Sequence, residues 1–135
     1  MTTWTEKLNS EDRYEVKPAP TNIAGMKTGE VMLVPTARQV DDFIRTLPRG
    51  RQMEVRDLRQ ALAAQHGAQV TCPITTGFHL RTVAEAAYEA YRRTGDVDAI
   101  TPFWRVININ TPTITKLTFA AFVLEQRQRE GLDHA

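Results

Sequence analysis

Three amphipathic stretches, each closed by glycine or proline, fill the middle of the chain and restrict the folds open to it. They cover residues 36–47, 54–67 and 75–95. In each stretch, apolar residues recur at intervals of three and four positions, which places them on one side of a helix. Because such helices must bury their apolar sides against a common core, the sequence predicts one mainly α domain.

The first stretch carries the clearest boundary signals. Thr36 is a good N-cap, and Gln39 three positions later completes a capping box. The apolar positions run from Val40 to Leu47, and the Pro-Arg-Gly sequence at 48–50 follows them. The pattern therefore predicts a helix that starts after Thr36 and stops at this turn.

A connection of seven residues, 68–74, separates the second and third stretches. Pro73 disfavours helix in this connection, so we expect Thr75 or Thr76 to cap the third helix. Two arginines followed by Gly95 form a favourable end for that helix. Two helices joined by a turn, with a third helix as support and a β element after them, are typical of a winged helix-turn-helix arrangement.

Short apolar runs on either side of the helices add a small β component. Residues 31–34 predict a brief strand or an extended lead-in, and residues 100–109 predict a turn that leads into a strand. A last helical stripe covers 117–124. The expected organisation is an extended N-terminal arm over 1–30, a winged-helix-like domain over 31–126 and a frayed C-terminal tail over 127–135.

Composition excludes several classes of protein. The chain has 135 residues, of which 41% are hydrophobic and 24% charged, with a net charge of +1. We expect a cytoplasmic protein without a membrane segment, because the N-terminus has no signal-peptide pattern and no apolar run is long enough to span a bilayer. A single cysteine, Cys72, excludes an internal disulfide, and His66, His79 and His134 lack metal-ligand spacing. We therefore expect neither a metal nor a cofactor.

Arginine is concentrated in the helical part of the chain. Ten of the thirteen arginines lie between Arg38 and Arg105, against eight acidic residues and no lysine. The flat guanidinium suits phosphates and base edges. The excess is modest, however, and a solvated arginine-rich surface explains it equally well. The charge permits DNA binding and does not establish it.

Three motifs resemble the DNA-binding half of the alkylguanine alkyltransferases and the alkyltransferase-like proteins. They are the Pro-x-Gly turn at 48–50, the Arg-x-Val-x-x-Ala element at 81–86, and the loop at 102–106, where those families have Pro-Cys-His-Arg-Val. The sequences at 72–77 and 101–105 resemble, more closely than they resemble the alkyltransferases themselves, a family of small bacterial proteins related to them. The resemblance implies a mainly α fold with a small β part, in a winged helix-turn-helix domain of alkyltransferase type.

The chain departs from the alkyltransferases where their chemistry takes place. Phe103 and Trp104 stand in the positions of the acceptor cysteine and its histidine, and neither can accept an alkyl group. The tyrosine that those families place at the start of the second helix corresponds to Val55 here. The spacing from Arg81 to Pro102 is also about five positions longer than theirs. We therefore expect no catalytic residues and no enzymatic activity.

The resemblance implies a DNA-binding role for Arg81, whose counterpart inserts into the base stack from the minor groove. The alternative is a surface arginine paired with Glu85 one turn later. Thr75, Thr76 and His79 lie near the same helix N-terminus, where amide groups favour a phosphate, although they could simply cap the helix. Arg49 and Arg51 could meet the DNA backbone from the preceding turn.

Phe103 and Trp104 have two interpretations. They could form an aromatic platform that stacks on a base, or they could belong to the core. Arg105 is expected to be structural. The function that the sequence favours is a non-catalytic DNA-binding domain, in recognition of alkylated DNA or in regulation. The alternative is a protein-interaction module that lost DNA binding, with a homodimer formed through the apolar C-terminal helix.

Overall fold

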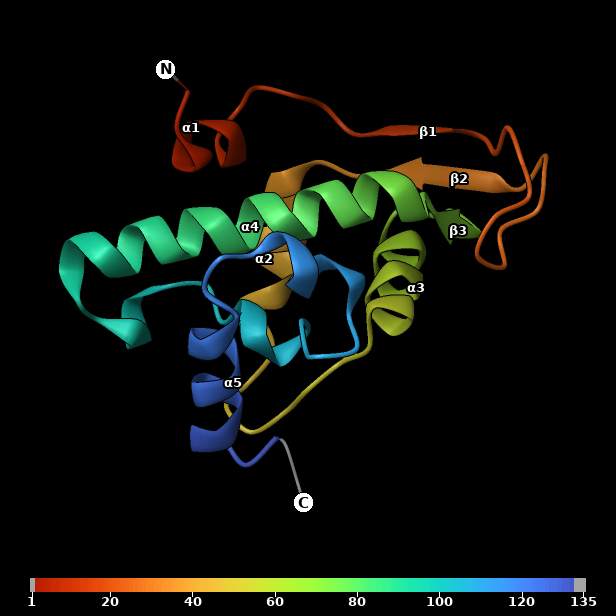
Figure 1. Cartoon of the computed structure of the whole chain (residues 1–135). Helices are drawn as coiled ribbons and strands as arrows, with labels where there is room; N and C mark the ends of the chain where they lie inside the picture. The colour runs from red at the N-terminus through yellow and green to blue at the C-terminus, as the bar shows by residue number, and fades with distance from the viewer. Residues whose placement is uncertain (1, 133–135) are drawn as a thin grey trace.

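The longest helix, α4 (Pro73–Thr94), crosses the molecule, and much of the rest of the chain packs around it (Figure 1). The computed structural model describes residues 2–132. The helix α1 lies along one side of α4, and α5 lies on the opposite side, close to the C-terminus. The other elements are α1 (Trp4–Leu8), β1 (Glu15–Pro18), β2 (Val31–Val34), α2 (Ala37–Ile44), α3 (Val55–Gln65), β3 (Val70–Thr71), α5 (Ala120–Arg129) and the 3₁₀ turns η1 (Val97–Ala99), η2 (Phe103–Arg105) and η3 (Pro112–Lys116).

The structure is mainly helical with a small sheet, as the sequence predicts. The capping box is present: Thr36 accepts from the Gln39 backbone N–H, and the Gln39 side chain accepts from the Thr36 N–H. Val40 and Ile44 are fully buried, and the helix ends at Ile44, so Leu47 reaches the core from the turn. The predicted helix is therefore about one turn too long.

The third predicted helix begins earlier than expected. Pro73 occupies its first turn, where the missing N–H needs no partner, and Cys72 is the N-cap. The prediction that Thr75 or Thr76 caps this helix is therefore wrong. Its other end is confirmed, because Gly95 takes the left-handed conformation at φ 70° and donates to the Tyr91 carbonyl at 2.7 Å.

The N-terminal segment is part of the fold. Strand β1 pairs antiparallel with β2, and β2 pairs parallel with β3. The helix α1 is fixed to α4 by Glu89, whose carboxylate accepts from the backbone N–H groups of Trp4 and Thr5 and from the Thr5 hydroxyl at 2.8–3.2 Å. The prediction of an extended arm over 1–30 is corrected, because this segment supplies both a helix and a strand.

The predicted strand within 100–109 is wrong. Phe103, Val106 and Ile107 are buried through a 3₁₀ turn, η2, and the next turn, η3, follows at Pro112. In the described part of the chain, all three strands precede α4, so no β wing follows residue 107 up to residue 132. A turn buries these apolar side chains on one side, which periodicity alone does not distinguish from a strand.

The predicted frayed tail over 127–135 is also corrected as far as residue 132. Helix α5 continues to Arg129, and both Arg127 and Leu132 are buried. The guanidinium of Arg127 donates to the Trp104 carbonyl and to the Gln52 side chain, each at 2.6 Å. Residues 133–135 lie outside the described part of the chain.

Helix α5 packs Phe122 and Val123 inside the molecule. Val123 is fully buried, and Phe122 packs against Tyr88, Tyr91 and Phe103 with ring centroids 4.8–6.2 Å apart. Ala121 stays exposed and Leu124 half-buried on this helix, so the homodimer through it stays a prediction. None of the helices within residues 2–132 combines the length and the apolar character that crossing a bilayer requires.

Replacing Thr36 by alanine removes the capping-box oxygen, so Thr36→Ala is expected to lower the free energy of unfolding by about 1 kcal/mol. Urea denaturation followed by circular dichroism measures the change. Thr118→Ala is the matched control, since Thr118 is exposed. Equal stability of the two variants would contradict the role of this cap.

Candidate functional site

The structure separates the predicted site residues into three places. Arg81 lines a groove on α4, Arg49 lines a second cavity near α5, and the aromatic pair at 103–104 lies in the core. The groove and the second cavity share no residue. The predicted single DNA-binding surface is therefore divided, and each part has its own chemistry.

The groove, called here the Arg81 groove, runs between the first half of α4 and η3. Three side chains on one face of α4 line it, namely Ile74, Phe78 and Arg81. Pro112 and Lys116 of η3 form part of the opposite wall, and the volume is about 350 Å³. Phe78 is 70% exposed and Ile74 53% exposed, which is unusual for side chains of this size. An exposed apolar pair beside two cations indicates a surface for a partner.

Arg81 is half-buried. Its guanidinium carbon lies 5.0 Å from the centre of the Trp4 ring, within the range of a cation–π contact. Its Nε is buried and has no hydrogen-bond partner among the residues described. No ion pair joins it to Glu85 there, although burial raises the pKa of Glu85 and the charge of Arg81 opposes that shift. The predicted alternative, a simple surface ion pair, is not formed.

The polar side chains at the start of α4 already have partners within the chain. The Thr75 hydroxyl donates to the Cys72 sulfur at 3.3 Å, and the buried Thr76 hydroxyl donates to the Cys72 carbonyl at 2.7 Å. His79 donates from Nε2 to the Pro35 carbonyl at 2.8 Å, and burial lowers the pKa of this imidazole. A histidine with a lowered pKa is mostly neutral at pH 7, so it adds little attraction for a phosphate.

Phe103 and Trp104 are 0% and 4% exposed. Phe103 packs edge-on against the Trp104 and Phe119 rings, with centroids 5.4 and 5.9 Å apart. Neither ring has a face free for a base, so the predicted aromatic platform is corrected: these residues form part of the core. Their packing agrees with the interpretation that they belong to the core.

The second cavity, called here the arginine cavity, has a volume of about 320 Å³. Four guanidinium groups line it, together with two carboxylates and several apolar side chains. The charged members are Arg45, Arg49, Arg105, Arg129, Asp98 and Glu130. Arg49 and Arg51 are exposed, but only Arg49 lines this cavity.

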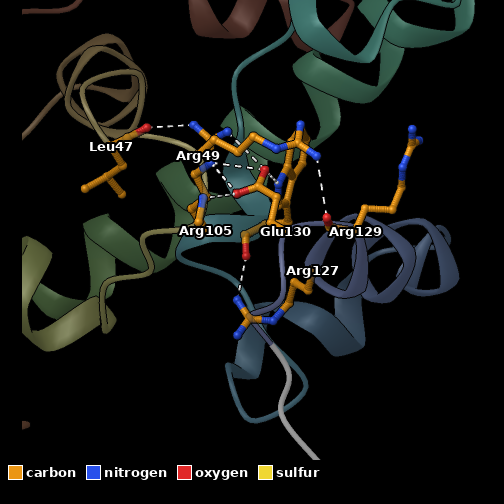
Figure 2. A network of polar contacts seen from close by, with 8 residues as sticks. Leu47, Arg49, Arg105, Arg127, Arg129 and Glu130 are labelled. Atoms are coloured by element: carbon orange, nitrogen blue, oxygen red, sulfur yellow. Dashed lines mark hydrogen bonds and ion pairs between the residues drawn. The ribbon is translucent and has the colours of Figure 1, made fainter.

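Glu130 lies at the centre of a polar network beside this cavity (Figure 2). Its carboxylate accepts from the Trp104 indole N–H at 2.6 Å, from the Gly50 backbone N–H at 2.9 Å and from the Arg105 guanidinium at 2.9–3.2 Å. Arg105 also donates to the Leu47 carbonyl at 2.6 Å, which confirms its predicted structural role. Burial alone would raise the pKa of Glu130, but the hydrogen bonds and the Arg105 charge outweigh it and lower the pKa.

Glu130 lies within the predicted frayed tail, so its role was not predicted from the sequence. The nearest signal was the apolar stripe at 117–124, whose helical period continues through Arg127. Extending that period by one turn would have placed the glutamate at a helix end rather than in a frayed segment.

Among residues 2–132, no group of three or more His, Cys, Asp and Glu side chains is placed to hold a metal ion. His134 lies outside the described residues. Cys72 is half-buried at the N-cap of α4, with the Thr75 hydroxyl as its hydrogen-bond donor.

Comparisons of the chain with protein-family models, with curated proteins and with solved structures gave no match. The resemblance to the alkyltransferases therefore rests on the three short motifs quoted above.

Glu130→Gln is expected to lower the free energy of unfolding by at least about 2 kcal/mol near pH 7, because a buried guanidinium loses its charged partner. The pKa of Glu130 in the folded chain is below its ordinary value of 4.5. Its stabilising contribution is therefore full above pH 4.5 and is lost as the pH falls through the lowered pKa.

Urea denaturation between pH 3 and pH 7 tests this expectation. The difference between the wild-type chain and Glu130→Gln should shrink below about pH 4.5. Glu125→Gln is the matched control, because Glu125 is exposed on the same helix. A difference that stays constant with pH would show that the ionised carboxylate is not the stabilising group.

Proposed function

We propose that the chain is a non-catalytic DNA-binding domain of helix-turn-helix type, in which α4 meets the DNA. The observation that carries the proposal is the face formed by Ile74, Phe78 and Arg81, where two exposed apolar side chains precede a guanidinium with an unpartnered buried donor. Proteins that bind the minor groove combine apolar wedges between base steps with arginine. The motif resemblance to the alkyltransferases supports the same position of the helix.

The charge of the Arg81 groove suits a polyanion. Arg81 and Lys116 line it, and none of its lining residues within 2–132 is a carboxylate. Each cation that neutralises a phosphate releases a counterion, so binding through two such contacts should be weak and should fall gradually with salt. The connection that carries Arg49 and Arg51 runs beside α5 (Figure 1), and neither residue lines the Arg81 groove. We therefore leave both residues out of the proposed DNA contacts.

The proposed domain has no alkyltransferase chemistry. A nucleophile is missing where the resemblance expects one, because Phe103 stands there and is fully buried. Recognition of alkylated DNA and regulation through undamaged DNA both fit a domain of this kind. The two roles differ in whether an alkylated base increases the affinity.

A protein partner is the second candidate, since exposed Phe78 and Ile74 could equally form the centre of a protein interface. Val123 and Phe122 of α5 pack within the chain, so we place the interface of a homodimer on the α4 face, where Phe78 and Ile74 are more exposed. Light scattering coupled to size-exclusion chromatography distinguishes this candidate. A dimer that Phe78→Ala converts to a monomer, without any DNA affinity, would favour the protein partner.

Fluorescence anisotropy with a labelled duplex tests the DNA proposal at about 50 and 200 mM salt. We expect salt-dependent binding that Arg81→Ala weakens about tenfold or more, the loss typical of one specific arginine contact. Phe78→Ala should weaken it as well, because the apolar wedge is lost.

Arg92→Ala is the matched control, since it removes the same charge from an exposed position of α4 outside the groove. Parallel titrations with single-stranded DNA and with a duplex that contains an alkylated guanine define the target. No binding to any of these at the lower salt concentration would refute the proposal, as would equal losses in Arg81→Ala and Arg92→Ala.

A further inference from the structure

The arginine cavity gathers four cations that are scattered along the chain. Arg45 follows α2, Arg49 lies in the turn after it, Arg105 belongs to η2 and Arg129 ends α5. The cavity lies where the 45–50 segment, η2 and the end of α5 meet (Figure 2). Cations that lie close together repel one another, which costs free energy. Each guanidinium therefore needs a neighbouring acid or a bound anion to offset the repulsion.

Two of the four guanidinium groups are neutralised by buried carboxylates. Arg105 is paired with Glu130 at 2.9 Å, and Arg45 is paired with Asp41, also at 2.9 Å. The side chains of Glu130 and Asp41 are 4% and 1% exposed. Glu130 also accepts from Trp104 and Gly50, and Asp41 accepts from the Thr101 hydroxyl. These carboxylates are therefore fully engaged with groups inside the chain.

Arg49 and Arg129 remain without a carboxylate partner within residues 2–132. Arg49 makes a single contact, from Nη2 to the Arg129 carbonyl at 3.5 Å, which is long for a hydrogen bond. The side chain of Arg129 forms no hydrogen bond or ion pair there, and it extends away from the cluster in Figure 2. Among residues 2–132, the other acid that lines the cavity is the exposed Asp98. Two arginines from different chain segments, both with unused side-chain donors among the residues described, thus line one cavity.

We propose that this cavity binds a small molecule through a phosphate monoester, with Arg49 and Arg129 donating to the phosphate. Two guanidinium groups that approach from different chain segments match a tetrahedral phosphate, whose three terminal oxygens point in different directions. A carboxylate offers two oxygens in one plane and suits a single guanidinium group. Ile100 and Pro102 form an apolar part of the cavity wall, against which the carbon skeleton of the ligand can pack.

The site is held in position by the network around Glu130. The carboxylate joins the backbone of Gly50 to the end of α5, so the residues next to Arg49 and Arg129 have a fixed separation. A binding site that is already arranged loses less entropy when it captures its ligand. The volume of about 320 Å³ is enough for a sugar phosphate and too small for a folded partner.

Titration of the ¹⁵N-labelled chain with ribose 5-phosphate, followed by NMR, tests the proposal. The reporters are the indole N–H of Trp104 and the backbone N–H of Gly50, which both bond to Glu130 beside the cavity. We expect saturable shifts of these signals at millimolar ligand. Ribose and sodium acetate at matched ionic strength should not reproduce them, and inorganic phosphate should bind more weakly.

The variants Arg49→Ala and Arg129→Ala should each raise the dissociation constant about tenfold, the usual loss for a charged hydrogen bond. Both side chains are exposed, so the variants should fold, and the spectra verify this. Arg92→Ala is the control and should bind as the wild type does. DNA affinity should not change in Arg49→Ala or Arg129→Ala, because the Arg81 groove contains neither residue.

Three results would overturn the proposal. They are shifts that acetate produces equally well, affinities that Arg49→Ala and Arg129→Ala leave unchanged, and the absence of saturable shifts at millimolar ribose 5-phosphate. Loss of DNA binding in both variants, without any effect of the sugar phosphate, would instead assign these arginines to the DNA backbone. The three overturning results do not depend on whether Arg81 binds DNA.

Discussion

The contact between Glu130 and Arg105 determines how the C-terminal half of the molecule is assembled. Neither group tolerates burial alone, since a lone ionised side chain in a protein interior costs several kcal/mol. Together with the Gly50 amide and the Trp104 indole they form one satisfied cluster. This cluster attaches the turn after α2, the turn η2 and the end of α5 to one another. Beside this cluster, Phe103 of η2 packs against the rings of Phe119 and Phe122 at the start of α5.

Local sequence signals identified the helical part of the fold. The capping box of α2, the glycine end of α4 and the strand at 31–34 each depend on residues within four positions of one another, and each is present. The errors concern contacts between distant residues. Periodicity does not show that β1 pairs with β2, or that the 103–107 segment buries its apolar residues through a 3₁₀ turn. Such choices are made by tertiary packing, which overrides local preference.

The roles of the charged residues also depend on contacts between distant parts of the chain, which the sequence does not reveal. Arg127 looks like part of a solvated tail, because sequence alone does not reveal the carbonyl of Trp104 that accepts its hydrogen bond. Arg49 and Arg81 look like members of one basic surface, yet they line separate spaces. In a chain with net charge +1, the local arrangement of cations and acids therefore matters more than their number.

The position of Trp4 couples the first helix to the face of α4 that carries Arg81. The indole lies against the guanidinium, and the Glu89 carboxylate accepts two backbone hydrogen bonds and one from the Thr5 hydroxyl of the same helix. A molecule that recruits the Arg81 side chain must compete with this indole, so occupancy of the groove and docking of the N-terminal helix are thermodynamically linked. A change that detaches the first helix from α4 would consequently alter the surroundings of the Arg81 side chain.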